Sequence, residues 1–179
     1  MVIWITGISG AGKTTLANAI VRRFKPKVPE LIQIDGDEIR ALFGPNLSYR
    51  EEDRYTHIGR IQKLAHMLDK QGALVVVGAL YAHPRLLDWN RKNFTAYLEV
   101  YIDAPLDLVK ARDAKGLYAK AEAGKMPHVV GIDVPWHAPT RADMVIDAKI
   151  GRSPDELAFE IALRTPRLAV TLEQSFGAE

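Results

Sequence analysis

Residues 2–15, VIWITGISGAGKTT, join an apolar stretch to a glycine-rich loop that ends in Lys13 and Thr14. The loop, residues 7–14, matches the phosphate-binding pattern GxxxxGK[ST] without a mismatch. That pattern needs a strand before it and a helix after it. Both are expected here, because Val2–Thr6 is apolar and β-branched and residues 13–24 have helical spacing. The sequence therefore predicts a phosphate-binding loop between a buried strand and a helix.

The chemistry of this loop indicates a nucleotide site. Its glycines let consecutive backbone N–H groups point at one anion, and the following helix adds its partial positive charge. The Lys13 ammonium would then compensate the β and γ phosphates, and the Thr14 hydroxyl would hold Mg²⁺. We expect ATP and Mg²⁺ as cofactors. The predicted nucleotide-binding residues are Gly7, Ser9, Gly10, Ala11, Gly12, Lys13, Thr14 and Thr15.

The rest of the chain alternates short apolar runs with longer stretches of helical spacing, which is typical of an α/β fold with a mostly parallel sheet. Further strands are expected at Leu31–Asp35, Ala73–Val77, Tyr97–Asp103 and Met144–Asp147. Helices are expected at Lys13–Phe24, Glu51–Gln71, Pro84–Asn93, Leu106–Arg112, Leu117–Ala123 and from about Ser153. We predict one domain over residues 1–168 and a C-terminal tail, 169–179, whose weak periodicity indicates disorder.

Composition narrows the class of protein. The 179 residues include 24 Lys and Arg against 22 Asp and Glu, so a net charge of +2 does not suggest binding to duplex DNA. The chain has no cysteine, which excludes disulfides, a thiolate nucleophile and a Cys-ligated zinc. Without a signal-peptide pattern or an apolar run of about 18 residues, we expect a cytoplasmic protein with no nucleic-acid or membrane partner. A homodimer is left open.

The acidic residues favour a kinase over a switch GTPase. No NKxD-type motif is present, and the run ALVVVG (73–78) ends without an acid, whereas IQIDGDEIR (32–40) places Asp35 and Asp37 after a strand. Either carboxylate could accept the proton of an acceptor hydroxyl or order the water around a metal, and Arg40 could clamp a second anion. The alternative is structural: Asp35 caps the next helix and Arg40 is a solvated charge.

Four blocks of sequence carry a resemblance to a known family. They are GISGAGKTT (7–15), DGDEIR (35–40), NLSYREEDR (46–54), and VYIDAPLDLVKARDAKGLYAKAEAGK (100–125) followed by GID (131–133). The sequence resembles the adenylylsulfate kinase family, which phosphorylates the 3′-hydroxyl of adenosine 5′-phosphosulfate with ATP. The resemblance implies a P-loop NTPase fold with a five-stranded parallel sheet in the order 2-3-1-4-5, flanked by helices and completed by a lid.

The same resemblance implies roles for individual residues. Asp37 would contact Mg²⁺ and the acceptor hydroxyl, and Arg40 and Arg54 would hold the phosphosulfate. Tyr49 takes the place of a Phe that packs on the adenine, and a Tyr ring can still stack. The segment 112–125 resembles the mobile lid, from which Arg112 and Lys115 would reach the transferring phosphate, and closing this lid would exclude water. The predicted catalytic residues are Lys13, Asp35, Asp37, Arg112 and Lys115, and the predicted metal ligands are Thr14 and Asp37.

The departures from the family pattern all fall on the acceptor side. His57 replaces an Asn, Val129 replaces an aromatic residue, and Ala82 and His83 stand where a Ser-Pro pair is usual. The predicted acceptor-binding residues are Asp37, Arg40, Tyr49, Arg54, His57, Lys115 and Val129. Adenosine 5′-phosphosulfate is the leading acceptor, and cytidine diphosphoramidate, the substrate of one branch of the family, is the alternative. A nucleotide-binding regulatory protein without turnover is the alternative from a different class.

Overall fold

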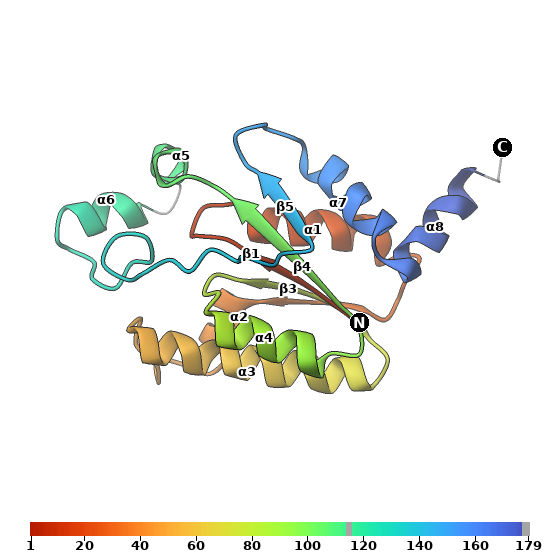
Figure 1. Cartoon of the computed structure of the whole chain (residues 1–179), viewed down its shortest axis with the longest axis horizontal. Coiled ribbons are helices and arrows are strands. Elements are labelled where there is room, and N and C mark those ends of the chain that lie inside the picture. The colour runs from red at the N-terminus through yellow and green to blue at the C-terminus, as the bar shows by residue number, and fades with distance from the viewer. Residues whose placement is uncertain (114–115, 177–179) are drawn as a thin grey trace.

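The computed structural model describes residues 1–113 and 116–176 and contains a parallel sheet with helices on both faces (Figure 1). The strands are β1 (Val2–Thr6), β2 (Leu31–Asp35), β3 (Leu74–Ala79), β4 (Tyr97–Asp103) and β5 (Met144–Asp147). They pair in parallel in the order β2-β3-β1-β4-β5, which confirms the predicted topology. The P-loop strand β1 therefore lies at the centre of the sheet, with Thr6 beside Ala79 of β3 and Tyr101 of β4.

Helices fill both faces of the sheet. They are α1 (Lys13–Phe24), α2 (Gly36–Leu42), α3 (Glu51–Lys70), α4 (Pro84–Asn93), α5 (Leu106–Arg112), α6 (Leu117–Glu122), α7 (Pro154–Leu163) and α8 (Pro166–Phe176). In β1, Ile3 and Ile5 pack with α1 and α7, whereas Val2 and Trp4 pack with α3 and α4. Because strand side chains alternate between faces, a strand buried on both sides is apolar throughout.

Apart from one-residue differences at the ends of some helices, the structure differs from the local predictions in three places. β3 spans Leu74–Ala79 rather than 73–77, and α2 was missed because its seven residues are too few to show a helical period. The third is the C-terminal tail, since residues 166–176 form α8 instead of a disordered segment that begins at 169. Leu168 and Leu172, one helical turn apart, are buried against the core, so this helix belongs to the domain.

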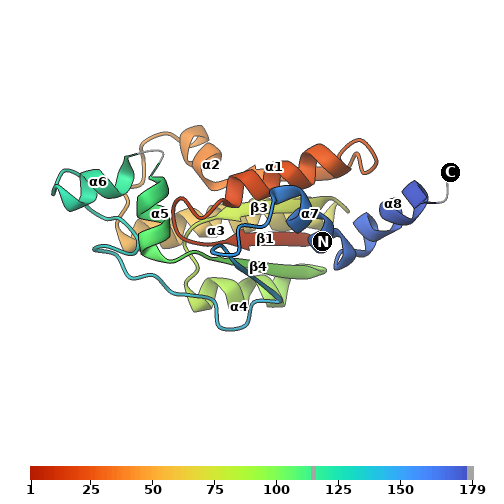
Figure 2. The ribbon, with the colours of Figure 1, turned by 90° about the horizontal axis from the view of Figure 1, so that it is seen from above.

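The ends of the molecule differ in character. Seen from above, α5 and α6 gather beyond the P-loop at one end, and α8 lies at the other (Figure 2). The carboxyl ends of all five strands point toward α5 and α6, and open α/β sheets bind ligands at that edge. Within the described residues, no helix is both long enough and apolar enough to cross a membrane.

The start of α7 generates a stability prediction. The Ser153 hydroxyl accepts the backbone N–H of Glu156, and the Glu156 carboxylate accepts the backbone N–H of Ser153, which is a complete capping box. Ser153→Ala should therefore lower the free energy of unfolding by about 1 kcal/mol in urea titration. Ser153→Thr keeps a capping hydroxyl and serves as the control. Equal stability of the alanine variant and the native protein would contradict this account.

Candidate active site

The P-loop forms a nest of backbone N–H groups at the carboxyl end of β1. Gly10 (φ 77°) and Gly12 (φ 103°) adopt left-handed conformations that favour glycine. Helix α1 begins at Lys13, and its N-cap is Gly12, which has no side chain that could cap the first turn. The N-terminus of this helix therefore points its backbone N–H groups toward the cavity in front of the loop, in the manner of a phosphate site.

Gly7 is required by a close approach of two chain segments. A Cβ atom at this position would lie 2.8 Å from the carbonyl oxygen of Ile102 and 3.2 Å from Cβ of Ala11. The loop can therefore pass next to the end of β4 only because residue 7 has no side chain. Gly7 and the buried Ala11 shape the loop from behind, whereas the other predicted nucleotide-binding residues face the cavity in front of it.

Asp35 connects the P-loop helix to α2. Its Oδ2 accepts the hydroxyl of Thr14 at 2.7 Å, and its Oδ1 accepts the backbone N–H of Asp37 at 2.8 Å. It is thus the cap of α2, as the structural alternative proposed, and also the partner of a P-loop hydroxyl. The Lys13 ammonium donates to the carbonyls of Gly7 and Ile8, both at 2.9 Å, and so lies against the same loop.

Two cavities meet at the carboxyl edge of the sheet. The smaller, about 260 Å³, lies over the P-loop, and the larger, about 640 Å³, lies between α2, α3 and the segment 126–130. Five residues line both cavities: Ser9, Gly36, Asp37, Leu80 and Leu117. Among these five, Asp37 alone has a carboxylate. An acid at this junction could act on a molecule in either cavity.

The larger cavity contains two arginines that suit an anion. Arg40 donates to the carbonyl of Ser48 at 3.0 Å, and Arg54 donates to the carbonyls of Tyr49 and His128 at 2.9 and 2.7 Å. Both guanidinium groups also lie over the Tyr49 ring, with distances to the ring centroid of 4.6 and 5.4 Å. Among the described residues, neither forms an ion pair with a carboxylate.

Burial and the positive charge of Arg40 lower the pKa of Arg54. Two neighbouring cations that are held by carbonyl oxygens, with no described carboxylate within ion-pair distance of either, form a favourable site for a doubly charged group. The structure therefore brings together Arg40, Tyr49 and Arg54, three of the predicted acceptor-binding residues, in one cavity.

His57 and Val129, which are also predicted to bind the acceptor, line the larger cavity too. The His57 Nε2 lies 2.9 Å from the carbonyl oxygen of Gly36, the residue that precedes Asp37, and burial lowers the pKa of this imidazole. Neutral His57 therefore donates Nε2–H to Gly36. On the opposite wall, Asp133 accepts the backbone N–H groups of His128 and Val129 at 2.6 and 2.5 Å. This turn presents Val129 to the cavity.

The lid segment contacts the P-loop through a residue that the sequence analysis did not single out. The Tyr118 hydroxyl donates to the carbonyl of Ser9 at 2.9 Å, and the carboxylate of Asp113 accepts the backbone N–H groups of Leu117 and Ala119. Arg112, predicted to reach the transferring phosphate, is exposed and lines neither cavity. Lys115, predicted for the same role, lies outside the described residues.

Comparison with known proteins shows the family to which the chain belongs. The family described as adenylylsulphate kinase matches residues 1–147. The chain belongs to the adenylylsulfate kinase family. It is 40% identical over 147 residues to the adenylyl-sulfate kinase of Paraburkholderia xenovorans, with 82% of each chain covered. The structure of the Mycobacterium tuberculosis APS kinase CysC in complex with AMPPNP and APS superimposes with a TM-score of 0.82 at 34% identity, covering 89% of this chain and 94% of that one.

Similarity within the adenylylsulfate kinase family extends to a protein with a different named substrate. The cytidine diphosphoramidate kinase of Campylobacter jejuni is 37% identical over 146 residues, with 82% of this chain and 85% of that protein covered. Overall sequence identity therefore does not show whether this chain is more similar in function to the adenylyl-sulfate kinases or to the cytidine diphosphoramidate kinase. The residues that line the larger cavity must supply the distinction.

The contact at Gly7 generates a prediction about nucleotide binding. Gly7→Ala should displace the loop and weaken ATP binding about 10-fold or more, because backbone atoms cannot yield as a flexible side chain can. Gly59→Ala is the matched control, since a Cβ on this α3 glycine would meet nothing within 4 Å. That control should keep ATP affinity and be up to about 1 kcal/mol more stable. Titration calorimetry with ATP compares the two, and equal affinities would contradict the packing argument.

Proposed function

We propose that this protein is an ATP-dependent kinase that phosphorylates a hydroxyl of a small, anionic nucleotide, with adenosine 5′-phosphosulfate as its acceptor. The observation that carries the proposal is the junction of two cavities at Asp37, with phosphate-binding chemistry on one side and an arginine pair on the other. A donor phosphate and an acceptor hydroxyl would meet there. A cytoplasmic location, where ATP is available, is part of the proposal.

On the donor side, the P-loop amides and Lys13 would bind the phosphates of ATP. Mg²⁺ prefers oxygen ligands, and the Thr14 hydroxyl and the carboxylates of Asp35 and Asp37 line the same cavity, so the donor set fits this ion. Thr14 and Asp37 would hold it, with Asp35 fixing the Thr14 hydroxyl. When bound, Mg²⁺ neutralises charge on the phosphates.

The chemical step would use Asp37 as the proton acceptor. The acceptor hydroxyl oxygen forms a bond to the γ phosphorus, the bond from that phosphorus to the β,γ-bridging oxygen breaks, and ADP leaves. The hydroxyl proton moves to the Asp37 carboxylate. Asp35 is less suited to this role, because it lines only the cavity over the P-loop, whereas Asp37 also lines the larger cavity where the acceptor would bind. We assign Asp35 to positioning.

On the acceptor side, Arg40 and Arg54 would hold the phosphosulfate group, and Tyr49 would stack on the base. The arginine pair supports an acceptor with two negative charges close together. Arg112 and Lys115 stay predicted contacts of the transferring phosphate. For these contacts to form, the lid would have to move toward the P-loop. A homodimer also stays a prediction.

Cytidine diphosphoramidate is the second candidate acceptor. The observation that favours it is Val129, which puts a small aliphatic side chain on the wall where the family usually places an aromatic ring. Loss of one stacking partner weakens a pocket for a purine more than one for a smaller pyrimidine. A relative from Campylobacter jejuni that is 37% identical to this chain is named for this acceptor, which also supports the second candidate.

The acceptor assay tests the proposal as a whole. Purified protein with ATP and Mg²⁺ should phosphorylate adenosine 5′-phosphosulfate, with stoichiometric ADP release and a product heavier by one phosphate group in mass spectrometry. Greater kcat/KM with cytidine diphosphoramidate would transfer the assignment to the second candidate. Tight ATP binding without turnover of either acceptor would contradict both and favour a regulatory protein.

Replacement of the proposed base tests the mechanism. Asp37→Asn keeps the size of the side chain but removes the negative charge that accepts the proton. It should lower kcat about 100-fold or more while ATP still binds. Glu38→Gln, at the next and exposed position on α2, is the matched control and should keep native turnover. Rapid-quench measurement of phosphoryl transfer separates this effect from product release. Native kcat in Asp37→Asn would exclude Asp37 as the base.

A further inference from the structure

A buried tyrosine joins the wall of the larger cavity to the start of α3. Tyr81 follows β3, and its side chain is 2% exposed and lines that cavity. Its hydroxyl donates to Oε1 of Glu51, the first residue of α3. Helix α3 also supplies Arg54 and His57 to the same cavity. The hydrogen bond therefore connects two walls of the cavity.

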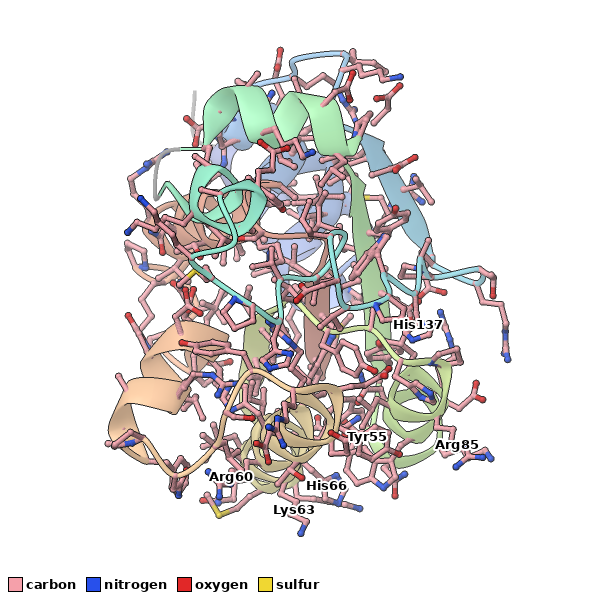
Figure 3. All side chains as sticks on the ribbon, turned by 90° about the vertical axis from the view of Figure 1, so that its left-hand side faces the viewer. Tyr55, Arg60, Lys63, His66, Arg85 and His137 are labelled. Atoms are coloured by element: carbon pink, nitrogen blue, oxygen red, sulfur yellow. The ribbon has the colours of Figure 1, made fainter. Side chains whose placement is uncertain are left out.

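A histidine from a distant loop completes the contact. The His137 Nε2 lies 3.4 Å from the same Oε1 of Glu51, and its ring meets that of Tyr81 edge-on with centroids 6.0 Å apart. His137 belongs to the segment between α6 and β5 that also contains 126–130, the cavity wall opposite α3. Figure 3 looks onto the carboxyl edge of the sheet and labels His137 and Tyr55 on the side where α3 and α4 lie.

The ring of His83 packs beside the contact between Tyr81, Glu51 and His137. Its ring stacks on Tyr81 at 6.3 Å between centroids and meets His137 edge-on at 5.2 Å and Tyr55 at 5.6 Å. The His83 Nδ1 accepts the backbone N–H of Arg85, which fixes the start of α4. The contact therefore lies within a cluster of four rings from three segments of the chain: Tyr81 and His83 after β3, Tyr55 in α3, and His137 before β5.

The protonation states favour the hydrogen bond at neutral pH. Hydrogen bonds from Tyr81 and His137 lower the pKa of Glu51, which is therefore a carboxylate and an acceptor only. Burial and the hydrogen bond to Glu51 raise the pKa of Tyr81, which therefore keeps its proton. Burial, followed by the charges of His137 and Arg85, lowers the pKa of His83. The pair is thus a neutral hydroxyl donating to a carboxylate, one of the stronger kinds of hydrogen bond.

We propose that Tyr81 is a positioning residue for the acceptor, and that its hydrogen bond to Glu51, supported by His137, sets the width of the larger cavity. Arg54 makes a second connection across the same opening through the carbonyl of His128. The Tyr81 hydrogen bond holds the loop after β3 against the start of α3. The contacts of His137 with Glu51 and of His128 with Arg54 hold the segment that contains Val129 against the same helix. The part of this inference that concerns the acceptor rests on the proposed function.

Kinetics of three variants test the inference. Tyr81→Phe and Glu51→Gln each weaken the hydrogen bond while the ring and the helix start remain. Each should raise KM for the acceptor about 3- to 10-fold, which is the usual effect of one such bond, with kcat and KM for ATP within about twofold of native. The double variant should equal the stronger single one, since both changes act on one interaction. Additive effects would overturn the inference, as would a fall in kcat at unchanged acceptor KM.

Tyr97→Phe is the matched control for loss of a buried tyrosine hydroxyl. The Tyr97 hydroxyl donates to Glu99 at 3.0 Å and accepts from Asn90 at 3.1 Å, and Tyr97 lines neither cavity. Its loss should lower Tm and leave the acceptor KM unchanged. If Tyr97→Phe raises that KM as much as Tyr81→Phe does, the effect is general destabilisation and the inference is wrong.

Hydrogen exchange tests the connection without an acceptor. In Tyr81→Phe and Glu51→Gln, backbone amides of residues 80–83 should exchange faster than in the native protein or in Tyr97→Phe, because the loop after β3 loses its attachment to α3. Unchanged exchange would overturn the inference. Failure of the native protein to phosphorylate either acceptor would instead count against the proposed function, and the exchange rates would still decide whether the connection exists.

Discussion

The active site depends on the position of one carboxylate. Asp35 ends β2, and its two oxygens hold the P-loop residue Thr14 and the first turn of α2. This double contact fixes the angle at which α2 leaves the sheet. Helix α2 in turn brings Asp37 to the junction of the two cavities and Arg40 into the larger one. A single side chain thereby couples the phosphate-binding loop to the acceptor side of the site.

Much of this arrangement was predictable from the sequence, because it depends on short-range patterns. The P-loop motif and the apolar runs located four of the strands exactly, and the pairing order followed from the family resemblance. Arg40, Tyr49, Arg54, His57 and Val129, named from separate segments, line one cavity. The dual role of Asp35 was within reach too, since an Asp before a helix is a common cap.

The parts that the sequence did not predict depend on contacts between distant segments. Tyr81 and Tyr118 look like ordinary buried aromatics in the sequence, and only the fold shows that their hydroxyls meet Glu51 and Ser9. For Tyr81, the sequence offers one signal of a role in the site: the residue follows a strand at the edge of the sheet where ligands bind. Helix α8 was missed although its apolar residues have helical spacing, with Leu168 and Leu172 one turn apart on the buried face.

A crystal structure with a non-hydrolysable ATP analogue, Mg²⁺ and adenosine 5′-phosphosulfate would test the central claim most directly. We predict the triphosphate over the P-loop in the smaller cavity, the phosphosulfate between Arg40 and Arg54, and the acceptor hydroxyl within hydrogen-bonding distance of Asp37. An acceptor bound outside the larger cavity, or a hydroxyl beyond the reach of Asp37, would contradict the assignment of the two cavities and of the residue at their junction.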